Sequence, residues 1–166
     1  ARGIGFGSRL VSDAIRAMQV VGPSGEVLYL TEVKREVPPF DLPFARCSVD
    51  RLFIPVMTCP DREAALVHYE DLSGNEGLRF DTRITVISAA LGLDREHRHP
   101  VATLQLRGST LIEIDQVPGL RPAPFGGDLP PTGIALIHFR HADAVNDVHP
   151  GCHTGAAGER YLIQNP

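Results

Sequence analysis

Two alternating segments joined by a short turn constrain the fold more than any other feature of the sequence. In HPVATLQL (residues 99–106) and STLIEIDQV (residues 109–117), polar and apolar residues alternate with the period of two that is typical of β-strands. Between them, Arg107-Gly108-Ser109 has the composition of a turn. The sequence therefore predicts an antiparallel β-hairpin.

The second strand of this hairpin carries an acidic residue among apolar ones. The period of two places Ile112 and Ile114 on one face, and Leu111, Glu113 and Asp115 on the other. A carboxylate in this position is either a rim residue on a wet face or a group that lines a concave surface. In the second case it can hold a metal ion, pair with an arginine or contact a ligand. The alternation alone leaves both interpretations open.

Along the rest of the sequence, the predicted elements follow a repeated order of strand, helix and further strands. Proline-rich stretches within residues 34–46 and 118–133 favour linkers. A helix is predicted from Asp61, where DREAALVHYEDL carries apolar residues at helical spacing, to the Ser73-Gly74 stop. Residues 77–93 read as a strand followed by a short helix. Further strands are predicted at 15–21, 27–33, 49–57 and 134–139.

The alternation also predicts which strand residues pack beneath the helix. Leu52, Ile54 and Val56 share one face of the strand at 49–57, and Ile112 and Ile114 are expected to join them. These five side chains should form the core under the helix.

Three stretches resemble the vicinal oxygen chelate superfamily, which includes glyoxalase I, bleomycin resistance proteins and extradiol dioxygenases. GPSGEVLYL is similar to the last strand of a family module, VDRLFIPV to its first strand, and DREAALVHYEDLSG to its helix. The resemblance implies an α+β fold of βαβββ modules. Such modules pair into a curved mixed sheet that forms a cup, with the helices on its outer face.

The same resemblance divides the chain into modules and linkers. It implies that residues 1–37 are the closing strands of a preceding module, 38–48 a linker, 49–118 the middle βαβββ module, 119–131 a second linker, and 132–166 the start of a further, incomplete module. We expect the chain to be part of a longer protein, and its modules to pair within the chain or in a homodimer.

The resemblance also implies where the cup binds its ligand. A His or Gln on a module's first strand and a Glu on its last strand supply metal ligands in this family. Glu113 occupies the last-strand position, but the first-strand position falls on Arg51, which cannot coordinate a metal ion. Tyr29 stands at the Glu position of the earlier module, and His138 lies near the first-strand position of the later one.

The implied cup residues are therefore Tyr29, Arg51, Phe53, Leu111 and Glu113, with Glu113 and His138 as the candidate metal ligands. An Arg51–Glu113 salt bridge in place of a metal ion would leave donors free for an anionic or carbonyl ligand. A shift of two residues would instead put Phe53 at the ligand position. His138 is either a cup residue or a hydrogen-bonded core histidine. His97 and His99 flank a strand start, and we expect them to be exposed.

Two functions from different classes follow from the resemblance. The first is a protein that binds a small organic molecule in the cup, with a degenerate metal site and no certain cofactor. The alternative is a lyase, isomerase or dioxygenase that depends on a divalent ion, which would be iron, manganese, nickel or zinc. The departure at Arg51 favours the first, and elemental analysis would separate them.

The composition limits the kinds of partner and the cellular location that we expect for the protein. A formal net charge of −4 argues against a nucleic-acid partner, and no apolar run approaches the roughly 18 residues that span a membrane. Three cysteines at unrelated spacings imply no disulfide framework. We therefore expect a cytoplasmic protein. The abundance of arginine over lysine resembles bacterial proteins from GC-rich genomes.

Overall fold

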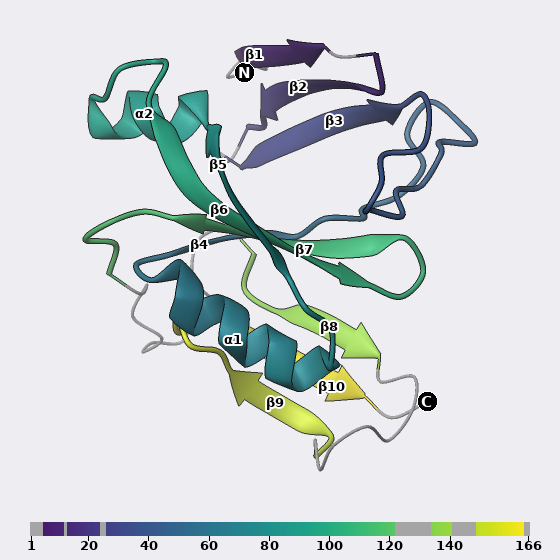
Figure 1. Cartoon of the computed structure of the whole chain (residues 1–166), viewed down its shortest axis with the longest axis vertical. Helices are drawn as coiled ribbons and strands as arrows, with labels where there is room; N and C mark the ends of the chain where they lie inside the picture. Colours follow the sequence, from purple (N-terminus) through teal and green to yellow (C-terminus); the bar gives the residue numbers. More distant parts are fainter. Residues whose placement is uncertain (1–4, 12, 24–25, 122–133, 141–148, 165–166) are drawn as a thin grey trace. The chain divides into compact units, whose positions relative to one another are not determined.

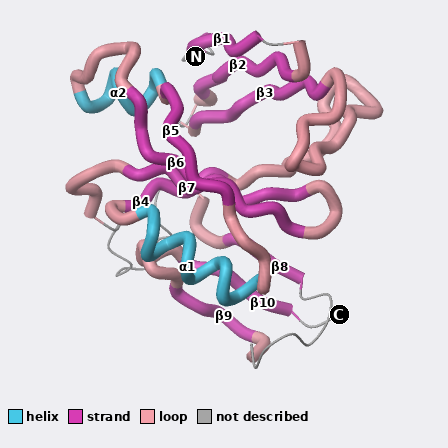
Figure 2. The backbone as a smooth tube through the Cα atoms, viewed as in Figure 1, coloured by secondary structure: helices cyan, strands magenta, loops and turns pink. Residues whose placement is uncertain are grey.

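The computed structural model describes residues 5–11, 13–23, 26–121, 134–140 and 149–164, and strands dominate these segments (Figures 1 and 2). The strands are β1 (Gly5–Val11), β2 (Ile15–Val21), β3 (Val27–Val33), β4 (Val56–Cys59), β5 (Leu78–Arg83), β6 (Arg98–Leu106), β7 (Thr110–Gln116), β8 (Ile137–Arg140), β9 (Gly151–Thr154) and β10 (Arg160–Gln164). The helices are α1 (Arg62–Ser73) and α2 (Thr85–Leu91). Neither is long and apolar enough to cross a membrane. The segment ADAVNDV (residues 142–148), whose sequence predicts the start of a helix, falls outside the described residues.

The chain packs as two compact units. The first contains residues 1–53, 83–98 and 107–110, and the second contains residues 54–82, 99–106 and 111–166. In the first unit, β1, β2 and β3 form an antiparallel sheet in that order. The predicted hairpin of residues 15–21 and 27–33 is confirmed, because β2 and β3 pair over their full length from Ile15↔Val33 to Val21↔Val27.

The second unit holds a four-stranded sheet of order β4-β7-β6-β5, with α1 against one face (Figure 1). β4 runs parallel to β7, with Val56 beside Glu113 and Thr58 beside Asp115. The predicted helix, the strand with a short helix within 77–93, and the closing hairpin are all present, but the predicted strand at 49–57 is wrong in extent, because β4 covers only Val56–Cys59. The mixed strand orientation confirms the α+β fold class, and the division into modules stays a prediction.

Local sequence explains where α1 begins and ends. The Asp61 side chain accepts hydrogen bonds from the backbone N–H groups of Glu63 and Ala64, so it caps the first turn. Gly74 ends the helix with a φ of 70°, a left-handed conformation that glycine adopts without strain. As predicted, the helix stops at this residue.

The core lies between α1 and the sheet. It consists of Met57, Cys59, Ala65, Leu66, Tyr69, Ala102, Leu104, Ile112 and Ile114. The prediction for Ile112 and Ile114 is therefore confirmed. The prediction for Leu52, Ile54 and Val56 was wrong, because Met57 and Cys59 are the residues that β4 turns toward the helix.

There is a physical reason why the side chains of this strand that face the helix were predicted wrongly. Apolar residues occupy both parities between residues 52 and 57, so alternation does not select one face. Pro55 has no N–H to donate to a sheet, and β4 starts only at Val56. Leu52 is 93% exposed in the loop before the strand, and Val56 is 37% exposed on the face away from the core.

A smaller sheet of order β8-β10-β9 also packs against α1. β8 lies parallel beside β10, so the arrangement of β4 beside β7 recurs here. Phe139 and Tyr161 contact the ring of Tyr69, whose hydroxyl donates a 2.6 Å hydrogen bond to Glu159 Oε1. His68 Nε2 and the Tyr161 hydroxyl are 3.0 Å apart. These aromatic contacts therefore hold the β8-β10-β9 sheet against α1.

Candidate functional site

The face of the four-stranded sheet opposite α1 carries the strongest candidate site. We call this surface the distal face. It consists of the side chains that alternate away from the core: Val56 and Thr58 of β4, His99, Val101 and Thr103 of β6, and Leu111, Glu113 and Asp115 of β7. The prediction that Leu111 and Glu113 share a face opposite the core is thus consistent with the alternation of β7.

Apolar side chains form part of the distal face. Val101 and Leu111 are completely or almost completely buried, at 0% and 1% exposure. Thr103 and His99 are also buried. The protein itself therefore covers this part of the face, and its exposed members are Val56 and Thr58 of β4.

Asp115 is the unusual residue of the distal face. Its exposure is 3%, and its Oδ1 atom is buried without a hydrogen-bond partner. The backbone holds it in place, because β7 lies between β4 and β6 and Asp115 is in register with Thr58. A buried carboxyl group without partners is costly, so its retention points to a group that is supplied from outside the described residues.

Glu113 adds a second carboxyl group two residues away. It is half-buried, and burial raises its pKa above the ordinary value. For Asp115, burial is the main cause and the neighbouring Glu113 the second cause of a pKa raised from 3.8 to about 8. The two groups therefore form an electrostatically strained pair on one strand.

The other predicted site residues lie elsewhere. Tyr29 on β3 is 44% exposed and bonds to Gln19 through its hydroxyl. Arg51 and Phe53 belong to the loop that precedes β4, and Arg51 Nε is 4.0 Å from Asp50 Oδ1. These three residues are in the first unit, whereas Glu113 is in the second, so the Arg51–Glu113 pair stays a prediction.

His138 is exposed on β8, in register with Leu162 of β10. Its neighbour Phe139 packs against the core around α1. The role of His138 as a metal ligand stays a prediction.

Two residues of the distal face were not recognised as functional from the sequence. Asp115 lies two residues after Glu113, and therefore on the same face of the strand. This spacing could have identified it as a second acidic residue of the candidate site. His99 was expected to be exposed, and that expectation was wrong, because it is 1% exposed on β6. It lies at the second position of a nine-residue strand that begins earlier than the apolar alternation indicated.

On the β4 side of the two carboxyl groups, the neighbouring residues are not typical metal ligands. Val56 lies beside Glu113, and Thr58 lies beside Asp115. Among the described residues, no three His, Cys, Asp or Glu side chains converge as ligands of one ion. The role of Glu113 as a metal ligand stays a prediction.

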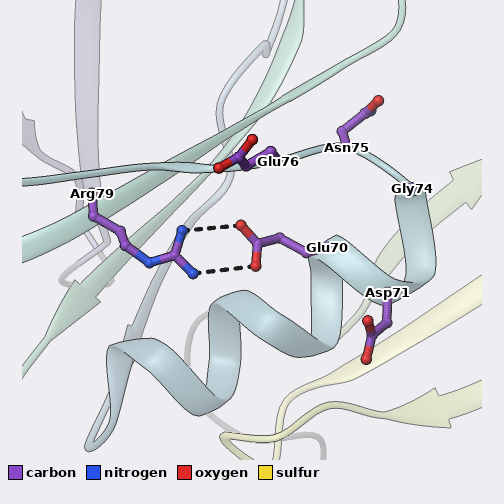
Figure 3. A pocket seen from close by; sticks show the side chains of 6 residues that line it. All are labelled: Glu70, Asp71, Gly74, Asn75, Glu76 and Arg79. Carbon is purple, nitrogen blue, oxygen red and sulfur yellow. Dashed lines mark hydrogen bonds and ion pairs between the residues drawn. The ribbon is translucent and has the colours of Figure 1, made fainter.

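A concave surface lies at the C-terminal end of α1 (Figure 3). It is lined by Glu70, Asp71, Gly74, Asn75, Glu76 and Arg79. Arg79 binds both carboxylate oxygens of Glu70, at 3.1 and 3.2 Å, and its Nε donates to Glu63 at 2.7 Å. Glu70 Oε1 also accepts from the Gly77 N–H. The Arg79–Glu70 contact thus already pairs opposite charges within the protein.

Comparison with known proteins supports the architecture at the level of the fold. No protein-family model and no curated protein sequence matches the chain. Among solved structures, it is similar to a glyoxalase family protein from Bacillus cereus, with a TM-score of 0.50 and 13% sequence identity. The match covers 74% of this chain and 98% of that chain. The chain therefore has a glyoxalase-like fold.

Proposed function

We propose that the protein binds a small organic molecule on the distal face and that it does so without a metal ion. The observation that carries this proposal is the buried Oδ1 atom of Asp115, which has no hydrogen-bond partner. On the same face Val56, which is 37% exposed, lies in register with Glu113, and the exposed Thr58 lies in register with Asp115, so the β4 side of the face is the part that a ligand can reach. A ligand that satisfies Asp115 would offset the cost of its burial.

The alternative is a metal-dependent lyase, isomerase or dioxygenase. One observation favours it: Glu113 stands on β7 at the position where the resembling family places a metal ligand. Elemental analysis of the purified protein separates the two functions. We expect no stoichiometric iron, manganese, nickel or zinc, and one equivalent of any of these ions would support the enzyme instead.

A fragment screen tests the binding function directly. We expect hits to change the backbone amide shifts of β6 and β7 in a saturable manner in two-dimensional NMR spectra. Glu113→Gln should weaken those hits, while the matched change Glu76→Gln in the depression beside α1 should not. Hits that shift only residues around Glu70 and Arg79 would place binding outside the distal face and contradict the proposal.

A further inference from the structure

The strand β3 combines an end position in its sheet with an exposed apolar surface. Within the part of the chain that the structure describes, the order β1-β2-β3 places β3 last in its sheet. Its first four residues are apolar or aromatic and are each 40–45% exposed: Val27, Leu28, Tyr29 and Leu30. The register of β1 shifts within the strand, as in a bulge that protects an edge, whereas β3 pairs regularly along its length. A regular apolar edge of this kind is a template for another strand.

The hydrogen bonds at the two ends of the β2-β3 ladder show which backbone groups of β3 point outward. The Gly22 N–H donates to the Glu26 carbonyl at 2.8 Å, and the Lys34 N–H donates to the Ala14 carbonyl at 2.8 Å. Successive residues of an antiparallel strand direct their backbone groups to opposite sides, so the even-numbered residues of β3 face β2. The odd-numbered residues of Val27–Val33 therefore direct their N–H and C=O groups to the outer edge.

The charges that flank the apolar residues select one register for the pairing of β3 with itself. In a two-fold symmetric antiparallel pair, the axis is perpendicular to the sheet and passes beside one residue of each strand. A register centred on Leu30 covers all of β3 and places Glu26 opposite Lys34 of the second copy. Centring one residue earlier would oppose Glu26 with Glu32, and centring one residue later would oppose it with Glu36. Like charges directly opposite each other are destabilising, so the register centred on Leu30 is favoured.

We propose that two copies of this chain associate through β3 and form one continuous antiparallel sheet of order β1-β2-β3-β3-β2-β1. The odd-numbered residues exchange backbone hydrogen bonds between the copies. Val27 lies opposite Val33, Tyr29 lies opposite Thr31, and Leu30 lies opposite itself. Because the contact uses only β3, it is independent of the ligand-binding function proposed above.

Disulfide formation between copies tests the register. The exposed Cys47 and Cys152 are first replaced by serine. Leu30→Cys should then give a covalent dimer on mild oxidation, because residue 30 of each copy forms a non-hydrogen-bonded pair with α-carbons roughly 4.5 Å apart. Leu28→Cys is the matched control, since it is similarly exposed but lies roughly 14 Å from its copy, beyond the reach of a disulfide. Equal rates for the two variants, or faster reaction of Leu28→Cys, would overturn this register.

Sedimentation velocity over a series of protein concentrations tests the association itself. We expect a reversible dimer of the full chain. Thr31→Pro should abolish it, because proline at this position removes an N–H that points to the outer edge and leaves the hydrogen bonds to β2 in place. Circular dichroism checks that the variant is folded.

A charge exchange at two exposed positions provides a second test that does not depend on the proline variant. Glu26→Lys should weaken association roughly tenfold, because it opposes two lysines at each end of the ladder, and the added change Lys34→Glu should restore it. A dimer that neither Thr31→Pro nor Glu26→Lys weakens would overturn the proposal. A chain that stays monomeric at every concentration would also overturn it and would assign the β3 edge to a strand of different sequence.

Discussion

Replacement of Asp115 by asparagine should change the pH dependence of stability. Asparagine keeps the shape of the side chain but does not titrate. In the native protein, the pKa of Asp115 is raised from 3.8 to about 8 by burial and by Glu113. Between these values the folded state keeps a proton that the unfolded state has lost. The free energy of unfolding of the unmodified protein therefore decreases as the pH rises from about 4 to about 8. The asparagine variant does not show this decrease, because its side chain does not titrate.

The magnitude follows from the distance between the two pKa values. Each pH unit in this window lowers the stability of the unmodified protein by about 1.4 kcal/mol relative to the variant. Between pH 5 and pH 7 the difference in unfolding free energy should grow by roughly 3 kcal/mol in favour of Asp115→Asn. Above pH 8 the total reaches about 6 kcal/mol, which is a large part of the stability of an ordinary domain.

Urea unfolding at pH 5, 6 and 7, followed by circular dichroism, measures this difference. The unsatisfied amide of asparagine adds an offset that does not depend on pH, so only the change with pH is informative. Asp71→Asn, at an exposed position, is the matched control and should give a nearly constant difference. A constant difference for Asp115→Asn as well would refute the reasoning, because it would mean that the carboxyl group ionises normally in the folded protein.

The other predictions concern the contacts around α1 and the pair inferred from the family resemblance. Asp61→Ala should cost about 1 kcal/mol of stability in urea unfolding through loss of the helix cap, whereas Asp61→Asn should preserve it; equal losses would contradict capping. Tyr69→Phe should cost about 1 to 3 kcal/mol by removing the donor to Glu159, and a neutral effect would show that water replaces it. In a double-mutant cycle, Arg51→Ala and Glu113→Gln should have additive effects, because Arg51 is paired with Asp50 and the structure shows no ion pair between Arg51 and Glu113 among its described residues; a coupling of at least about 1 kcal/mol would instead establish the salt bridge that the resemblance implies.

Much of the second unit could be predicted because its signals are local. The period of two in β6 and β7 predicted the hairpin and placed Ile112 and Ile114 in the core, and helical spacing with Gly74 predicted the extent of α1. These patterns depend only on residues that are close together in the sequence. The face of β4 was misassigned because apolar residues of both parities precede Met57, and only packing against the helix decides between them.

Other features depend on residues far apart in the sequence. His68, for example, bonds to Tyr161, which is 93 residues away in the sequence. His99 is buried although its local sequence, REHRHP, is highly charged. The isolation of the Asp115 Oδ1 atom is likewise a property of three-dimensional packing, whereas its place beside Glu113 was visible in the alternation of STLIEIDQV. Sequence therefore located the candidate surface but not its most unusual residue.

The most direct measurement is a carbon-detected NMR titration of the side-chain carboxyl groups with the tightest-binding hit of the fragment screen. It observes Asp115 Cγ and Glu113 Cδ themselves, and it compares them with exposed acids such as Asp71 and Glu76 in the same spectrum. A ligand site on the distal face predicts saturable shifts of Asp115 and Glu113, with Asp71 and Glu76 unchanged. Shifts confined to Asp71 and Glu76, with Asp115 and Glu113 constant at saturation, would contradict it.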